Sequence, residues 1–171
     1  VAERIEVHAA RARELGKVWR KAAAVEELLE RFPGKVVIFC EFRATISELI
    51  IRLEASGIET QAFHGGMNPK ARSAALKRFK DSARVLISSR AGAEGLNIQF
   101  CSTVINFDLP WNPMIVEQRI GRVDRIGQKH IVRAMNFALA DTVELRVREV
   151  LEEKLARILE EFGVDKLADV L

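Results

Sequence analysis

Short apolar runs rich in β-branched residues recur along this chain and constrain its fold more than any other feature. The clearest are KVVIFC at 35–40, RVLIS at 84–88 and TVINF at 103–107. Runs of this length, bounded by turns, are typical of strands buried on both faces of a parallel sheet. Weaker strand patterns occur at about 59–63 and 132–138. Because helical patterns separate the runs, we predict an α/β fold, a doubly wound three-layer parallel sheet with helices on both faces.

Capping residues mark where the helices between these strands should begin. Asn68-Pro69 and Asn112-Pro113 each place an N-cap residue before a proline suited to the first helical position. Thr45-Ile46-Ser47-Glu48 has the sequence of a capping box, and Gly57 is predicted to close the helix that follows it. The first, second and fourth predicted strands are therefore each expected to lead into a helix that covers the sheet.

Two further amphipathic stripes flank the sheet region. The first predicts a helix that ends at Pro33-Gly34, and the second predicts a long helix that begins at Asp141. Residues 1–33 are therefore expected to be a helical lead-in, 34–140 the sheet domain and 141–171 a C-terminal amphipathic brace. No apolar run approaches the length of a membrane span, so no membrane partner is expected. Cys40 and Cys101 are interpreted as buried thiols of a cytoplasmic protein.

The formal charge is distributed unevenly along the chain. The whole chain carries +3, but residues 1–140 carry a net +7 and residues 141–171 a net −4. A basic body with an acidic tail fits a polyanionic partner. The excess is moderate, so charge alone favours nucleic acid only slightly over other partners.

The stretch VEQRIGRVDRIGQK at 116–129 gathers arginines after a helix start. If the helix that begins at Asn112 continued through it, Gln118, Gly121, Arg122 and Arg125 would share one narrow face. Two guanidinium groups beside a glycine suit an anion, since they donate to phosphate oxygens and the glycine allows close approach. A solvated basic helix face is the competing interpretation for arginines at this spacing.

Three unusual loops are predicted to follow the carboxyl ends of the strands, where parallel α/β sheets bind ligands. They are His64-Gly65-Gly66, the stretch from Ser88 to Asn97, and the stretch from Asp108 to Pro113. Glycine N–H groups and Ser or Arg side chains can donate to phosphates. Each loop is a weak signal by itself, but their convergence on one edge, together with the arginine stretch, favours a phosphate-binding site.

The segments KVVIFCEF, FHGGM, VLISSRAGAEGLN, FDLPWNP and QRIGRVDRIGQ, in this order over about 17–140, resemble motifs IV to VI of superfamily 2 helicases. They are similar to those of the Swi/Snf-type double-stranded DNA translocases, including the bacterial RNA-polymerase-recycling ATPase branch. The resemblance implies that 34–140 forms the C-terminal RecA-like lobe of a two-lobe motor of the P-loop NTPase class. Gly121 and Asp124 fit the bacterial branch, and Asn97 departs from the aspartate common in RNA helicases.

The resemblance also implies roles for individual residues. Arg122 and Arg125 match the arginine fingers that reach the γ-phosphate of ATP held by the first lobe. The positions implied beside the nucleotide are Gln118, Gly121, Gly95 and Asn97. The positions implied to contact the nucleic-acid backbone are Arg43, His64, Gly65, Gly66, Ser89 and Arg90.

The chain contains neither a GxxxxGK[ST] loop nor an Asp-Glu pair after a strand. Asp108 ends a strand without a neighbouring carboxylate and is interpreted as structural, and no metal ligands are predicted. We therefore expect ATP and its Mg²⁺ to be held by an N-terminal lobe of the same longer protein, and this chain alone to hydrolyse nothing. The open alternatives are an RNA helicase lobe and a nucleic-acid-binding module without an ATPase role.

Overall fold

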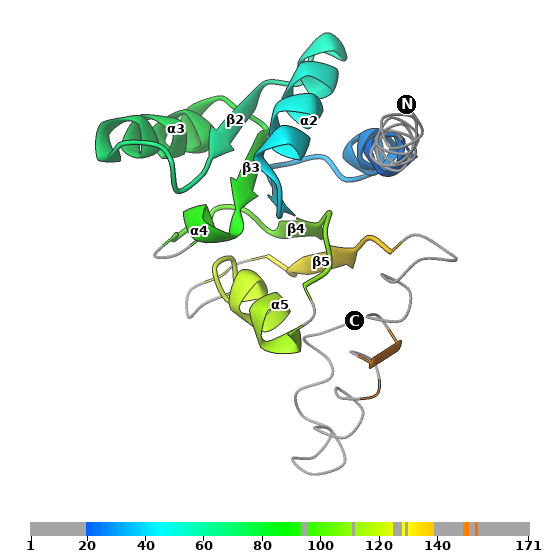
Figure 1. The fold of residues 1–171 in the computed structure, drawn as a ribbon. Helices are drawn as coiled ribbons and strands as arrows, with labels where there is room; N and C mark the ends of the chain where they lie inside the picture. Colours follow the sequence, from blue (N-terminus) through cyan, green and yellow to red (C-terminus); the bar gives the residue numbers. More distant parts are fainter. Residues whose placement is uncertain are drawn as a thin grey trace, which may run out of the picture. The chain divides into compact units, whose positions relative to one another are not determined.

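The computed structural model describes residues 20–93, 96–110, 112–124, 128, 130–138, 149–150 and 153 (Figure 1). The chain divides into two compact units, Val1–Pro33 and Gly34–Leu171. In the first unit a helix covers 20–31 and buries Ala22, Val25 and Leu29, whose spacing is that of the predicted amphipathic stripe. No helix among the described residues is long and apolar enough to cross a membrane.

The second unit contains a five-stranded parallel sheet with the strand order β2-β3-β1-β4-β5. The strands are β1 (Val36–Cys40), β2 (Thr60–Phe63), β3 (Val85–Ser89), β4 (Thr103–Asn106) and β5 (Arg133–Asn136). Every residue of β1, β3 and β4 is buried, as expected of strands covered on both faces. The predicted α/β fold and its five strands are confirmed.

Helices cover both faces of this sheet. They are α2 (Arg43–Ala55), α3 (Pro69–Asp81), α4 (Arg90–Ala93) and α5 (Pro113–Ile120). On one face, Phe79 of α3 and Val123 after α5 join a core cluster with Val37, Leu86 and Val104, which are partners in the strand register. The helix α2 packs on β1, β2 and β3 but contributes nothing to this cluster, so it covers the other face. Figure 1 shows α3 beside the edge strand β2, and α5 beside β4 and β5.

Of the three helix starts predicted between the strands, two are confirmed. The Oδ1 atom of Asn68 accepts the Ala71 N–H at 2.8 Å, and that of Asn112 accepts the Met114 N–H at 3.0 Å. The predicted capping box is wrong, because α2 already begins at Arg43 and the Ile46 N–H donates to the Phe42 carbonyl oxygen at 3.2 Å. Thr45 is therefore a buried residue of the first turn and not an N-cap.

Gly57 lies just after α2 with a φ of +75°, a left-handed conformation that glycine adopts without strain. Its predicted role in closing α2 is thus confirmed. The long helix predicted from Asp141 lies almost wholly outside the described residues. The division into 1–33, 34–140 and 141–171 stays a prediction.

Candidate functional site

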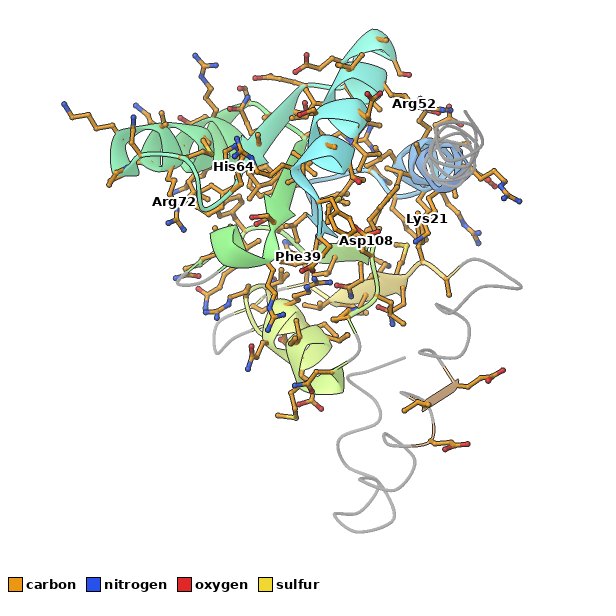
Figure 2. The ribbon with its side chains drawn as sticks, viewed as in Figure 1. Lys21, Phe39, Arg52, His64, Arg72 and Asp108 are labelled. Carbon is orange, nitrogen blue, oxygen red and sulfur yellow. The ribbon has the colours of Figure 1, made fainter. Side chains whose placement is uncertain are left out.

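The carboxyl ends of β1 and β4 form the centre of the candidate site. These strands are neighbours in the sheet. The strand that follows β1 in the sequence lies on one side of the pair, and the strand that follows β4 lies on the other side. In doubly wound sheets ligands bind at such a point, where the strand order reverses. The Phe107 N–H donates to the Phe39 carbonyl oxygen at 3.0 Å, and the Glu41 N–H donates to Oδ2 of Asp108 at 2.8 Å. Phe39 and Asp108 accordingly lie close together in Figure 2. The Asp108 carboxylate joins the two strand ends, in line with its structural interpretation.

The helix α5 is shorter than predicted. It ends at Ile120, Gly121 is its C-cap, and residues 121–123 form a turn in which the Arg122 N–H donates to the Arg119 carbonyl oxygen at 3.2 Å. The carbonyl oxygen of Arg122 accepts the Ile98 N–H at 3.2 Å, which fixes the turn to the segment before β4. The prediction of one continuous helix face is therefore wrong, although Arg122 still follows α5 directly.

The predicted nucleotide-side residues are only partly described. Gln118, Gly121 and Asn97 are exposed, and the side chain of Arg122 is half-buried. A Cβ added at Gly121 would meet only the carbonyl oxygens of Glu117 and Gln118 within 4 Å among the described residues, so the space beside it is otherwise open. The predicted residues Gly95 and Arg125 lie outside the described residues.

Gln128 is a residue that holds this segment in place and that the sequence did not single out. Its Nε2 atom donates to the carbonyl oxygens of Gln99, Cys101 and Val123 at 2.9, 3.1 and 3.1 Å. It therefore fastens the chain after α5 to the turn before β4. Its place in the DRIGQ sequence was the only available signal, since a lone glutamine has many possible roles.

The structure brings Arg43 and His64, two of the predicted backbone contacts, together at Gly66. A Cβ at Gly66 would lie 3.4 Å from both Nη1 of Arg43 and Nδ1 of His64. Burial, and then the charge of Arg43, hold the pKa of His64 below its ordinary value. Its Nδ1 atom has no hydrogen-bond partner among the described residues. Arg43, Gly65 and Gly66 are exposed, so an anion can reach the guanidinium and the glycine backbone, although the Nδ1 atom of His64 is buried.

The sequence predicts that Ser89 lies in the loop after the third strand, but in the structure it is the last residue of β3. Its side chain is buried, and its Oγ accepts the Gly92 N–H at 3.2 Å. Arg90 follows as the exposed first residue of the four-residue helix α4. Ser89 thus holds α4 in place, while Arg90 is open to a ligand at the carboxyl edge.

Gly92 and Arg72 fasten α4 to β2, and neither was predicted to do so. A Cβ at Gly92 would lie 2.4 Å from the Phe63 carbonyl oxygen, so only glycine fits this approach. Nη2 of Arg72 donates to the Gly92 carbonyl oxygen at 3.0 Å, and its guanidinium lies 4.8 Å from the centre of the Phe63 ring. Figure 2 shows Arg72 and His64 on the side of the molecule that carries α3. From the sequence, Arg72 was indistinguishable from the exposed lysines of α3.

Arg119 is a buried arginine within the arginine-rich stretch at 116–129. It is 2 % exposed, and its Nη1 donates to Oδ1 of Asn106 at 2.8 Å and to the Asp108 carbonyl oxygen at 3.1 Å. Its guanidinium carbon lies 5.2 Å from the centre of the Phe39 ring. Burial lowers the pKa of Arg119, and the nearby acidic groups of Glu41 and Asp108 oppose this shift. Among the described residues its Nε and Nη2 atoms have no partner, which costs about 1–3 kcal/mol for each unpaired group.

Solved structures with the same fold define the class of protein. The chain superposes with a TM-score of 0.72 and 25% identity on a structure described as the C-terminal part of the Fun30 ATPase domain, over 77% of this chain and 44% of that one. It superposes with a TM-score of 0.70 and 27% identity on the C-terminal domain of the DEAD-box protein Dbp5, over 81% of this chain and 79% of that one. The class is the C-terminal RecA-like lobe of a superfamily 2 helicase.

The family follows from the sequence matches. The model of the helicase conserved C-terminal domain matches residues 20–127, and the chain belongs to this family. It is 42% identical over 151 residues to the uncharacterized ATP-dependent helicase YqhH of Bacillus subtilis, and 43% identical over 122 residues to the RNA polymerase-associated protein RapA of Pseudomonas fluorescens. These matches cover 88% and 67% of this chain. The resemblance to the Swi/Snf-type group and its bacterial branch is confirmed.

The chain is much shorter than these relatives. It spans 27% of the length of YqhH and 13% of the length of RapA. What the whole relatives do is therefore carried to this chain only as a proposal.

The contact at Gly92 gives a testable prediction. Gly92→Ala should lower the free energy of unfolding by about 1–3 kcal/mol, because the new methyl group overlaps the Phe63 carbonyl oxygen. The matched control, Gly66→Ala, places a methyl group at ordinary contact distance from two side-chain ends and should change it by about 0.5 kcal/mol or less. Urea unfolding of both variants measures the difference. Equal stability of the two would contradict the close approach.

Proposed function

We propose that this chain is the second lobe of an ATP-driven translocase on duplex DNA and that Arg122 and Arg125 are its arginine fingers. The observation that carries the proposal is the turn after α5. There Arg122 lies two residues after the end of α5, its carbonyl oxygen accepts the Ile98 N–H, and Gln118 and Gly121 are exposed in the same segment. The similarity to YqhH, which is described as an ATP-dependent helicase, supports the same assignment.

In this proposal the chain's own residues act on a triphosphate that the first lobe presents. ATP and its Mg²⁺ are assigned to that N-terminal lobe of the same protein, and they supply the phosphoryl group and its neutralising cation. Arg122 and Arg125 donate to the phosphoryl oxygens as charge develops on them. Gln118, Gly121, Gly95 and Asn97 border the nucleotide and orient it. Closure of the two lobes on ATP brings these groups together.

The nucleic-acid contacts are assigned to the opposite part of the carboxyl edge. Arg43, the imidazole of His64 and the exposed backbone of Gly65 and Gly66 form an open cluster of donors beside β2, and Arg90 adds a cation at the end of β3. Ser89 contributes by holding α4. Such donors bind phosphates without reading bases, as a motor that moves along a duplex requires. We place the protein in the cytoplasm, which suits the two free buried cysteines.

A nucleic-acid-binding module without an ATPase role is the second candidate, and α3 favours it. The exposed side chains of Lys70, Lys77, Arg78 and Lys80 project from this helix, which carries one acidic residue, Asp81. A module that bound phosphates only through such cations would be indifferent to ATP. The similarity to the C-terminal domain of Dbp5 keeps an RNA helicase lobe as the third candidate.

The arginine-finger assignment is tested in the full-length protein. Arg122→Ala and Arg125→Ala should each lower kcat for ATP hydrolysis by roughly 10³-fold or more, because the guanidinium of an arginine finger mainly stabilises the transition state. Affinity for duplex DNA should stay within about twofold of the parent, since these residues face the nucleotide. ATP turnover and DNA binding are measured for each variant. Unchanged turnover in both variants would contradict the motor.

The parent protein is also assayed with duplex DNA and with duplex RNA. Stimulation of ATP turnover by RNA alone would favour the RNA helicase.

A second prediction concerns the chain by itself. Purified without the first lobe, it should release no phosphate from ATP above background, with or without duplex DNA. Its sequence contains no Walker loop to cradle the phosphates. Release of phosphate is followed with a coupled colorimetric assay. Robust turnover by the isolated chain would contradict the proposal that it is half of a motor.

The cluster around His64 predicts pH-dependent binding of DNA. Burial and Arg43 keep the pKa of His64 below its ordinary value in the free protein, and a phosphate bound there would raise it. Protons are then taken up on binding, so affinity should rise as pH falls, by up to about tenfold for each unit of pKa increase. His64→Gln should flatten the pH profile of the dissociation constant, whereas the control His130→Gln, at an exposed histidine, should not. An unchanged profile in His64→Gln would place the phosphate elsewhere.

A further inference from the structure

The side chain of Arg119 lies at the carboxyl ends of the neighbouring strands β1 and β4. In doubly wound sheets this position is where ligands commonly bind. Here the guanidinium of Arg119 reaches the two strand ends from α5. Its Nη1 donates to Oδ1 of Asn106 and to the Asp108 carbonyl oxygen, and its central carbon lies near the Phe39 ring. Arg119 therefore connects α5 to the ends of both central strands.

Stability alone does not account for the burial of Arg119. A buried guanidinium loses its hydration, and apolar side chains of similar volume often replace buried charges without loss of stability. Two of its nitrogens have no partner among the described residues, so its hydrogen bonds do not offset the burial fully. Arg119 instead fixes an orientation, because a planar guanidinium held by two oxygens and against an aromatic ring can adopt only one arrangement.

We propose that Arg119 is a positioning residue that sets the place of Arg122 relative to the carboxyl ends of β1 and β4. This inference rests on the arginine-finger role proposed above. The two residues are linked directly, since the Arg122 N–H donates to the Arg119 carbonyl oxygen at 3.2 Å. A shift of α5 on the strands is therefore passed to the base of the Arg122 side chain. Misplacement of a catalytic group by about 1 Å can cost about 100-fold in rate.

Lys35 offers a matched control at the opposite end of β1. Its Nζ atom donates to the Ala83 carbonyl oxygen at 2.9 Å and lies 5.5 Å from the centre of the Phe79 ring. It thus makes the same two kinds of contact as Arg119, a bond to a carbonyl oxygen and an approach to an aromatic ring. It precedes β1, so it lies away from the carboxyl edge.

The test uses the full-length protein that contains this chain. Arg119→Met should lower kcat for DNA-stimulated ATP hydrolysis by about 10- to 100-fold, with KM for ATP and affinity for DNA within about twofold. Lys35→Met should lower the melting temperature but leave kcat within about twofold, because Lys35 lies at the end of β1 opposite to the carboxyl edge. Arg119→Lys, whose side chain is shorter and lacks the planar fork, should give an intermediate kcat.

A double-variant comparison separates positioning from a general loss of structure. If Arg119 acts through Arg122, the kcat of Arg119→Met/Arg122→Ala should equal that of Arg122→Ala alone. The inference is overturned if Arg119→Met keeps kcat within about twofold, or if the two effects multiply in the double variant. If Arg119→Met does not fold, Arg119→Lys decides, since parental turnover in that variant also overturns the inference. Loss of turnover in Arg122→Ala with parental turnover in Arg119→Met refutes only this inference, whereas parental turnover in Arg122→Ala refutes the proposed function as well.

Discussion

The parallel pairing of β1 with both β3 and β4 is the constraint on which the rest of the structure depends. All five residues of β1 are buried, and its register with the two neighbours aligns Phe39 with Ser88 and with Asn106. A shift of one residue would turn the core-facing side chains to the opposite face. Because every strand runs in the same direction, the segments that follow β1, β2, β3 and β4 all emerge at one edge. The candidate site is a consequence of that alignment.

Two sites are proposed at this edge, and described residues of the segment between β3 and β4 contact the surroundings of both. At its beginning, the Gly92 carbonyl oxygen is bonded to Arg72 and its Cα packs on the end of β2, beside the His64 loop. At its end, the Ile98 N–H donates to the Arg122 carbonyl oxygen. One piece of backbone therefore contacts the surface proposed for nucleic acid and the turn proposed for the nucleotide. Such an arrangement offers a physical path by which the two sites can influence each other.

The strands β1, β3 and β4 were predictable from the sequence because burial on both faces selects short apolar runs rich in β-branched residues, whereas the partly exposed β2 and β5 left weaker patterns. The two Asn-Pro helix starts were predictable for an equally local reason, since an N-cap bond is made within three residues. The capping box misled because the first turn of α2 is set by Phe42, which carries no capping side chain. The arginine stretch misled because helix continuation was assumed, whereas the Arg122 carbonyl oxygen is bonded to a residue 24 positions earlier. Arg119, Arg72 and Gly92 could not be found from the sequence, because their partners lie in other elements.

The central claim, that Arg122 is presented to a triphosphate held by another lobe, is tested most directly by one structure. The full-length protein would be crystallised with duplex DNA and a transition-state mimic such as ADP with aluminium fluoride. We expect a guanidinium nitrogen of Arg122 within about 3 Å of the fluoride group that replaces the γ-phosphate. A closed complex in which Arg122 points away from the nucleotide, with every contact to the mimic made by the first lobe, would contradict it.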